Sequence, residues 1–230
     1  MLNLADKLRC NYGFTLAEVL ITLGIIGIVA ALTIPTLLNK TNDAELKTAW
    51  KKVYSDISNA HSQMIASNEL PYATPQEYFT ALETHITTSK KCDAPQSEGC
   101  WHQANNWSAY NGRLDVINLD NFAGTLNKGY ILNNGALVAF TSFIHLATPG
   151  VYNYTGERNA IALVDVNGFK KPNKMGADIF VVEFFYNKAL PMGSIGTLQT
   201  DDGMYCNKNH MGSSNDGWTC SDNVILNVDY

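Results

Sequence analysis

The chain has 230 residues, of which 46% are hydrophobic and 16% are charged. This composition is typical of a folded protein and excludes an intrinsically disordered one. The net charge of −5 and the scattered lysines argue against nucleic acid as a partner, because phosphate-binding proteins usually present a clustered basic face.

The N-terminal region combines a polar leader with an apolar run. Residues 1–13 read MLNLADKLRCNYG, and residues 19–38 read VLITLGIIGIVAALTIPTLL without a charged side chain. This run has the roughly 20 residues that a helix needs to cross hydrocarbon. Lys7 and Arg9 precede it, so the positive-inside tendency predicts a cytoplasmic N-terminus and an exported remainder.

The leader differs from an ordinary secretory signal, in which a small-residue cleavage site follows the apolar part. A cut after Gly13 would instead remove the polar leader and keep the apolar run. It would free a new amine at Phe14, four residues before Glu18. A carboxylate in a segment of bilayer length is costly and usually functional, so Glu18 is a candidate site residue.

The hexapeptide GFTLAE (residues 13–18), followed by an apolar run, resembles the processing and N-methylation motif of type IV prepilins and type II secretion pseudopilins. In this resemblance Gly13 matches the residue before the cut, and Phe14 matches the methylated first residue. Glu18 matches the glutamate at the fifth processed position. Pro35 matches the proline that commonly lies 22 residues into the processed helix.

The resemblance implies a filament subunit. A prepilin peptidase would remove the leader, residues 1–13. Residues 14–38 would lie in the inner (cytoplasmic) membrane and later in the filament core, and residues 39–230 would form an exported globular domain. Like subunits, other pilins or pseudopilins and an inner-membrane assembly platform are the implied partners. The family's glutamate is thought to neutralise the N-terminal amine of a neighbouring subunit, and the filament would be periplasmic or at the cell surface.

The helical pattern continues beyond the apolar run. In residues 43–66, DAELKTAWKKVYSDISNAHSQMIA, apolar side chains recur at spacings of three and four. We therefore predict one helix over about 14–66, whose second half packs one face on a sheet. Gly24, Gly27 and Pro35 weaken the first half, which either melts locally during assembly or packs closely through its small residues.

The remaining elements predict an α+β fold. The capping box Thr74–Glu77 indicates a short helix from Pro75 through about Ile86. Two β-rich runs flank Asn134-Gly135, which is typical of a hairpin. Residues 160–166 and 177–185 are two further β runs. About four antiparallel strands covered by the long helix would give the ladle shape of a pilin.

The cysteines beyond the apolar run are Cys92, Cys100, Cys206 and Cys220. An even number with local spacing favours disulfides in an oxidising compartment. Of the three connectivities we prefer Cys92–Cys100 with Cys206–Cys220. Four reduced, buried thiols are the alternative, and a zinc site is disfavoured because no CxxC occurs.

An aromatic cluster offers a second class of function. The segment WHQANNWSAYNG places Trp101, Trp107 and Tyr110 among polar residues. Exposed rings could bind sugars, which would favour a membrane-tethered exported binding module for a carbohydrate or surface ligand that does not polymerise. The other interpretation is that the rings pack a loop over the core.

The linker DVNGFKKPNKMGAD contains four oxygen-bearing side chains, Asp165, Asn167, Asn173 and Asp178. Calcium wants six to eight oxygen ligands, and some major pseudopilins hold calcium in a comparable loop. The EF-hand spacing is absent and three lysines intervene, so the alternative is an ordered turn built on Asn, Gly and Pro. We expect no required cofactor and keep calcium as a candidate.

No catalytic set stands out. The five histidines lack metal-ligand spacing, and the sequence has no G-x-S-x-G, H-E-x-x-H or P-loop. We therefore expect that the protein is not an enzyme.

Overall fold

The computed structural model describes residues 13–67, 75–114, 128–141, 158–185, 187–197, 199–200, 206–207 and 217–228. The leader before Gly13 and Thr74 of the predicted capping box lie outside these ranges. The chain divides into two compact units, Met1–Asp43 and Ala44–Tyr230.

The first unit is helical from Leu16, where α1 (Leu16–Ala66) begins. The predicted helix over 14–66 is confirmed, and it stays helical across Pro35. Side chains of residues 13–43 are exposed except the half-buried Ala30. The hydroxyls of Thr22 and Thr33 donate to the carbonyls four residues earlier, so neither polar group is left unpaired for hydrocarbon.

The second unit contains one antiparallel sheet in which each strand pairs with its neighbours in the chain. The strands are β1 (Thr88–Cys92), β2 (Lys128–Leu132), β3 (Leu137–Thr141), β4 (Arg158–Asp165), β5 (Ile179–Phe185) and β6 (Ala189–Pro191). The predicted count of four strands is wrong, because the sheet has six. The four predicted runs form β2 to β5, and the hairpin turn has Gly135 at φ 87° as glycine allows.

Edge position explains the two missed strands. β1 reads TSKKC and exposes its central side chains, and β6 has three residues and ends in a proline. Lysine and proline are typical of strands that end a sheet, where they discourage pairing with another chain. Neither segment shows the apolar alternation from which a strand can be predicted.

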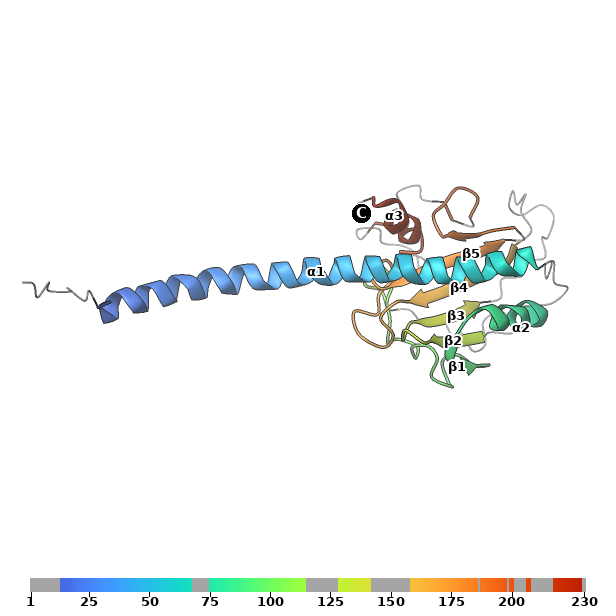
Figure 1. Ribbon diagram of the computed structural model, residues 1–230, viewed down its shortest axis with the longest axis horizontal. Coiled ribbons are helices and arrows are strands. Elements are labelled where there is room, and N and C mark those ends of the chain that lie inside the picture. Colours follow the sequence, from blue (N-terminus) through green and yellow to red (C-terminus); the bar gives the residue numbers. More distant parts are fainter. Residues whose placement is uncertain are drawn as a thin grey trace, which may run out of the picture. The chain divides into compact units, whose positions relative to one another are not determined.

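Helices cover one face of the sheet (Figure 1). Residues 44–66 of α1 and α2 (Pro75–His85) share a core with β2 to β5. Trp50 is fully buried, stacks on Phe180 with ring centroids 4.8 Å apart, and donates from Nε1 to the carbonyl of Ser221 at 3.0 Å. Ser221 belongs to α3 (Cys220–Leu226), so the C-terminal helix is tied to both α1 and the sheet.

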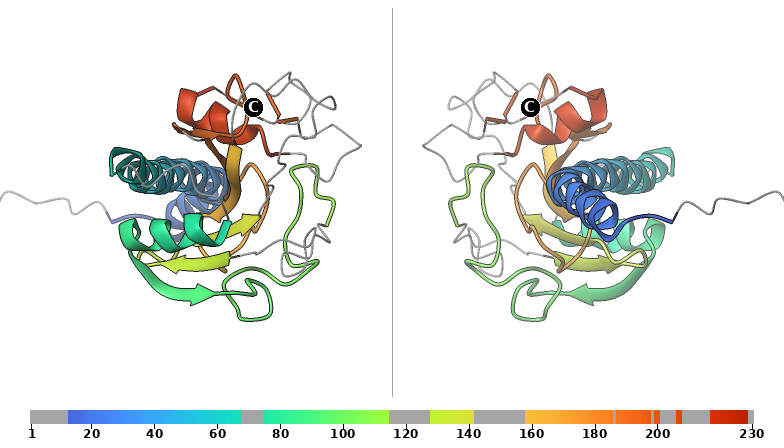
Figure 2. Two further views of the ribbon diagram at one scale, coloured as in Figure 1. Left: turned by 90° about the vertical axis from the view of Figure 1, so that its right-hand side faces the viewer. Right: turned by 90° about the vertical axis from the view of Figure 1, so that its left-hand side faces the viewer.

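Loops cover the opposite face of the sheet, as Figure 2 shows for the segment that follows β1. Trp101 and Trp107 pack there against Leu137, Leu163 and Val181. Because both faces are covered, β5 is buried at every position. This explains why its sequence, IFVVEFF, is apolar at every position except Glu183 and shows little alternation.

Two disulfides, Cys92–Cys100 and Cys206–Cys220, cross-link loop segments of this unit. This is the connectivity preferred from the sequence. The first bond closes the loop that leads from β1 to Trp101. The second joins the start of α3 to the segment before it. Both bonds are therefore structural staples of the loop-rich side of the unit.

Candidate processing and assembly site

The Gly13–Phe14 peptide bond lies outside any regular element. Residues 13–15 are not helical, and Phe14 is 88% exposed. A protease reaches an exposed non-helical bond more readily than one inside a helix. The structure thus leaves the predicted cleavage position accessible, and two residues, Phe14 and Thr15, separate it from the first residue of α1.

Thr15 and Glu18 form a capping box at the start of α1. The backbone N–H and the hydroxyl of Thr15 both donate to Glu18 Oε2 at 2.8 Å. The Glu18 N–H donates in return to Thr15 Oγ1 at 3.2 Å. Two backbone donors that a helix start leaves unsatisfied are thereby paired.

This local role of Glu18 was missed from the sequence, although the signal was present. Threonine followed three residues later by glutamate, directly before an apolar run, is the sequence signature of a capping box. Only Oε2 is used by the cap, since Glu18 Oε1 accepts no hydrogen bond from the described residues. One carboxylate oxygen of Glu18 therefore fixes the start of α1.

Pro35 lies inside α1 without ending it. At Gly24 and Gly27 an added Cβ would meet nothing within 4 Å, so neither glycine is required by a contact within the chain. The two interpretations of these glycines are local melting of α1 and close packing of α1 with other helices. Both stay predictions.

The calcium candidates gather in the connection between β4 and β5, where their carboxylates accept hydrogen bonds from the chain itself. Asp178 accepts from the backbone N–H groups of Asn173 at 2.8 Å and Lys174 at 2.6 Å. Asp165 accepts from the N–H of Asn167 at 3.1 Å and lies 2.8 Å from His102 Nε2. Burial raises the pKa of Asp178, and it raises the pKa of Asp165 to about 7 although the His102 contact acts in the opposite direction.

These contacts favour the ordered-turn interpretation. Each carboxylate is already a hydrogen-bond acceptor, and Asn173 has φ 51° in the left-handed region that asparagine tolerates. Within the described residues no group of three or more His, Cys, Asp or Glu could hold a metal ion. Two amide oxygens, Asn167 Oδ1 and Asn173 Oδ1, are buried and accept no hydrogen bond there. They are the atoms that an ion would have to use.

The aromatic cluster packs the core. Trp101 and Trp107 are each 1% exposed and Tyr110 is 7% exposed. Rings buried to this extent offer no face on which a sugar could stack. The interpretation as a packed loop is confirmed, and the tethered carbohydrate-binding module loses the observation that suggested it.

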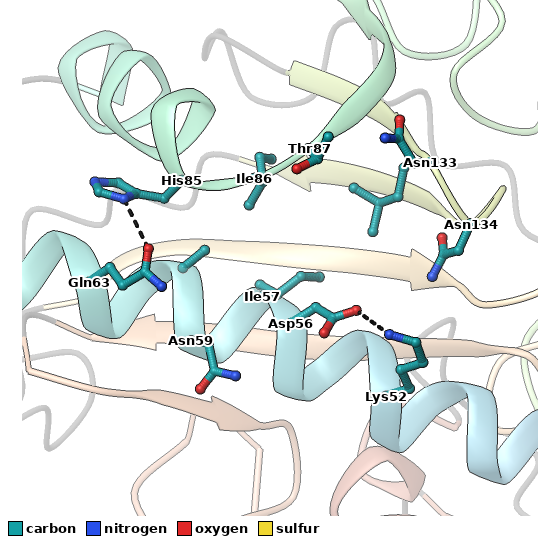
Figure 3. A pocket seen from close by; sticks show the side chains of 12 residues that line it. Lys52, Asp56, Ile57, Asn59, Gln63, His85, Ile86, Thr87, Asn133 and Asn134 are labelled. Atoms are coloured by element: carbon teal, nitrogen blue, oxygen red, sulfur yellow. Dashed lines mark hydrogen bonds and ion pairs between the residues drawn. The ribbon is translucent and has the colours of Figure 1, made fainter.

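A groove of about 380 Å³ lies between α1 and the segment joining α2 to β1 (Figure 3). Ile57, Ile86 and Leu132 supply apolar lining. At its rim, Lys52 pairs with Asp56 at 3.1 Å, and other polar lining groups, Gln63 and His85, are 3.2 Å apart. None of its twelve lining residues is Trp, Tyr or Phe, and the lining presents no nucleophile paired with a base.

The fold and the site define a class: an α+β protein with one long apolar helix at its N-terminus. Among the described residues, α1 is the one helix long and apolar enough to cross a membrane, which supports anchoring by a single span. Residues 8–34 match the family model described as the prokaryotic N-terminal methylation motif. The chain therefore carries the signature of prepilins and pseudopilins, and its fold is pilin-like. No curated protein and no solved structure matches the chain.

Proposed function

We propose that this chain is a structural subunit of a type IV pilus-like filament or a type II secretion pseudopilus. The observation that carries the proposal is the methylation motif, residues 8–34, which includes the first part of an exposed apolar helix. Such a helix needs lipid or other helices around it. The inner membrane would hold it before assembly, and like subunits or other pilins would surround it afterwards. The role is structural and not catalytic.

Processing is the first step of the proposed function. A membrane prepilin peptidase cleaves the exposed Gly13–Phe14 bond and methylates the new amine, and the subunit then joins the filament at an inner-membrane assembly platform. Mass spectrometry of the mature protein should find a chain that begins with N-methyl-Phe14. A membrane-bound chain that still begins with Met1 would contradict this step and return the protein to the class of tethered modules.

Glu18 is the proposed contact between subunits. Its Oε2 serves the Thr15 cap, so its Oε1 is the atom proposed to accept the ammonium of Phe14 from a neighbouring subunit. An unpaired carboxylate in hydrocarbon costs about 3 kcal/mol, and an ammonium partner removes part of this cost. Because the pair forms at one relative height of the two helices, it would also set their register.

The capping box provides matched variants that separate the two roles. Glu18→Gln keeps a side chain that can cap but removes the charge, and we expect filament incorporation to fall about tenfold or more. Thr15→Ala removes the cap and keeps the charge, at a cost of about 1 kcal/mol of helix stability, so incorporation should be largely retained. Membrane insertion should be normal in both variants.

Immunoblotting of sheared filament and membrane fractions measures incorporation. Filaments formed equally well by Glu18→Gln would refute the charge pair. A defect of the same size in both variants would instead assign the role of Glu18 to the helix cap.

A further inference from the structure

The β4–β5 connection presents an exposed tip, Phe169, Lys170 and Lys171, which we call the basic tip. Phe169 is 54% exposed and both lysines are exposed. Among the described residues, no carboxylate lies within salt-bridge distance of either ammonium. The nearby Asp165 and Asp178 are buried and hydrogen-bonded to other groups, and neither forms an ion pair with the lysines of the tip.

Contacts with His102 and with the β2–β3 hairpin hold the basic tip in place. The rings of Phe169 and His102 form a T-shaped pair, with ring centroids 5.3 Å apart and an interplanar angle of 80°. Gly168 has φ 74°, and a Cβ there would lie 2.7 Å from the Gly135 carbonyl, so the connection rests closely on the β2–β3 hairpin. A surface fixed in this way loses little conformational entropy when it binds.

The tip lies at the end of the Ala44–Tyr230 unit at which α1 enters. β4 points toward this end, and the connection follows it there (Figure 1). Trp50 lies six residues after Ala44 and stacks on Phe180. Phe180 is the second residue of β5, so it lies close to the end of the connection. Lys51 donates to Asn227 Oδ1 at the same end, where Leu226 and Val228 on either side of Asn227 are exposed.

The segment between the apolar run and Ala44 is short, which keeps the end of the unit that contains Ala44 near the membrane. The apolar run ends at Leu38, and only residues 39–43 separate it from Ala44. Even a fully extended segment of this length spans no more than about 20 Å. The charges around the junction balance, since Lys40 and Lys47 accompany Asp43 and Glu45. The basic tip therefore adds positive charge to this end of the unit, beside Lys51, which donates to the neutral amide of Asn227.

We propose that the basic tip docks on anionic lipid headgroups of the membrane that α1 spans. Lysine ammonium groups are attracted to anionic headgroups, and an aromatic ring favours the interface between headgroups and acyl chains. The anchor makes this contact intramolecular, so individually weak contacts suffice to orient the domain. The inference uses only the membrane anchoring of the proposed function and holds whether or not the subunit polymerises.

The experiment uses the full chain in nanodiscs that hold one copy each. Phe169 is replaced by the photoreactive p-benzoylphenylalanine, and lipid adducts are measured by mass spectrometry in phosphatidylcholine discs with and without about one third phosphatidylglycerol. Position 188 is the matched control, because Lys188 is exposed and follows the far end of β5. We expect about tenfold more phosphatidylglycerol adducts at 169 than at 188.

Charge reversal completes the test. Lys171→Glu should abolish the excess of adducts at 169, whereas Lys188→Glu changes the net charge equally and should leave it intact. Equal adduct yields at the two positions, or yields independent of phosphatidylglycerol, would overturn the proposal. In a second preparation of discs that hold several copies, adducts of position 169 to another copy in place of lipid would also overturn the proposal. Co-elution of protein with the discs reports anchoring separately, so a failure of anchoring is distinguishable from a failure of docking.

Discussion

The two parts of α1 obey different rules although they belong to one helix. Residues 16–38 expose almost every apolar side chain, whereas Trp50, Val53 and Ile57 are each at most 2% exposed. The second part finds its partners in the sheet of its own chain. The first part has an apolar surface that lipid or other subunits must cover. Its sequence is therefore fitted to surroundings that the chain does not itself provide.

The largest expected effect comes from breaking the buried part of the helix. Trp50→Ala removes the stack on Phe180 and the bond to Ser221, and it should destabilise the folded unit by about 3–5 kcal/mol. Leu32→Ala is the control, because Leu32 is 72% exposed and should leave unfolding unchanged. Urea unfolding of the full chain in detergent, followed by near-ultraviolet circular dichroism, measures both. Equal effects of the two substitutions would contradict the distinction.

A smaller effect concerns how the folding stability of the Ala44–Tyr230 unit depends on pH. The pKa of Asp165 is raised to about 7, so the folded state binds its proton more tightly than the unfolded state. The corresponding stability is fully present below the unfolded pKa of 3.8 and is lost as the pH rises through 7. His61 acts oppositely, since burial lowers its pKa and its contribution is lost as the pH falls below 6.5.

Asp165→Asn isolates the carboxyl group, because His61 is the same in both proteins. Between about pH 8 and pH 5.5, the wild type should gain about 2 kcal/mol relative to the variant. Unfolding in detergent over this range measures the difference. A constant difference across the range would show that Asp165 titrates alike in the folded and unfolded states.

The smallest expected effect sharpens the interpretation of the β4–β5 connection. Because Asp165 and Asp178 are already hydrogen-bonded, we expect the unit to fold without calcium. The melting temperature of the full chain, measured by calorimetry with calcium or chelator, should then differ by less than about 1 °C. A rise of several degrees that chelator reverses would mean that the amide oxygens of Asn167 and Asn173 bind an ion.

Local patterns predicted much of this fold. Helical spacing predicted α1, and β-rich runs with an Asn-Gly turn predicted β2 to β5. Short spacing of cysteines pointed to both disulfides. The edge strands were missed because pairing to a neighbour, and not their own sequence, makes them strands. The assembly role predicted for Glu18 stays a prediction, and its cap to Thr15 was missed.

Contacts between residues far apart in the sequence could not be predicted from sequence patterns. His102 and Asp165 are 63 positions apart, and no spacing rule links them. His61 Nε2 lies 2.7 Å from the carbonyl of Phe185, a contact that only the packing of α1 on the sheet creates. The burial of the tryptophans likewise depended on which face the loop covers. Each of these features is set by tertiary structure, which overrides local preference.

The bond from Trp50 to Ser221 joins residues 171 positions apart. A ribosome delivers the indole long before it delivers its carbonyl partner, so the sheet-facing side of the helix stays uncovered through most of synthesis. Contacts this distant along a polypeptide form slowly. The indole of Trp50 therefore gains this hydrogen-bond partner only after residue 221 has been synthesised.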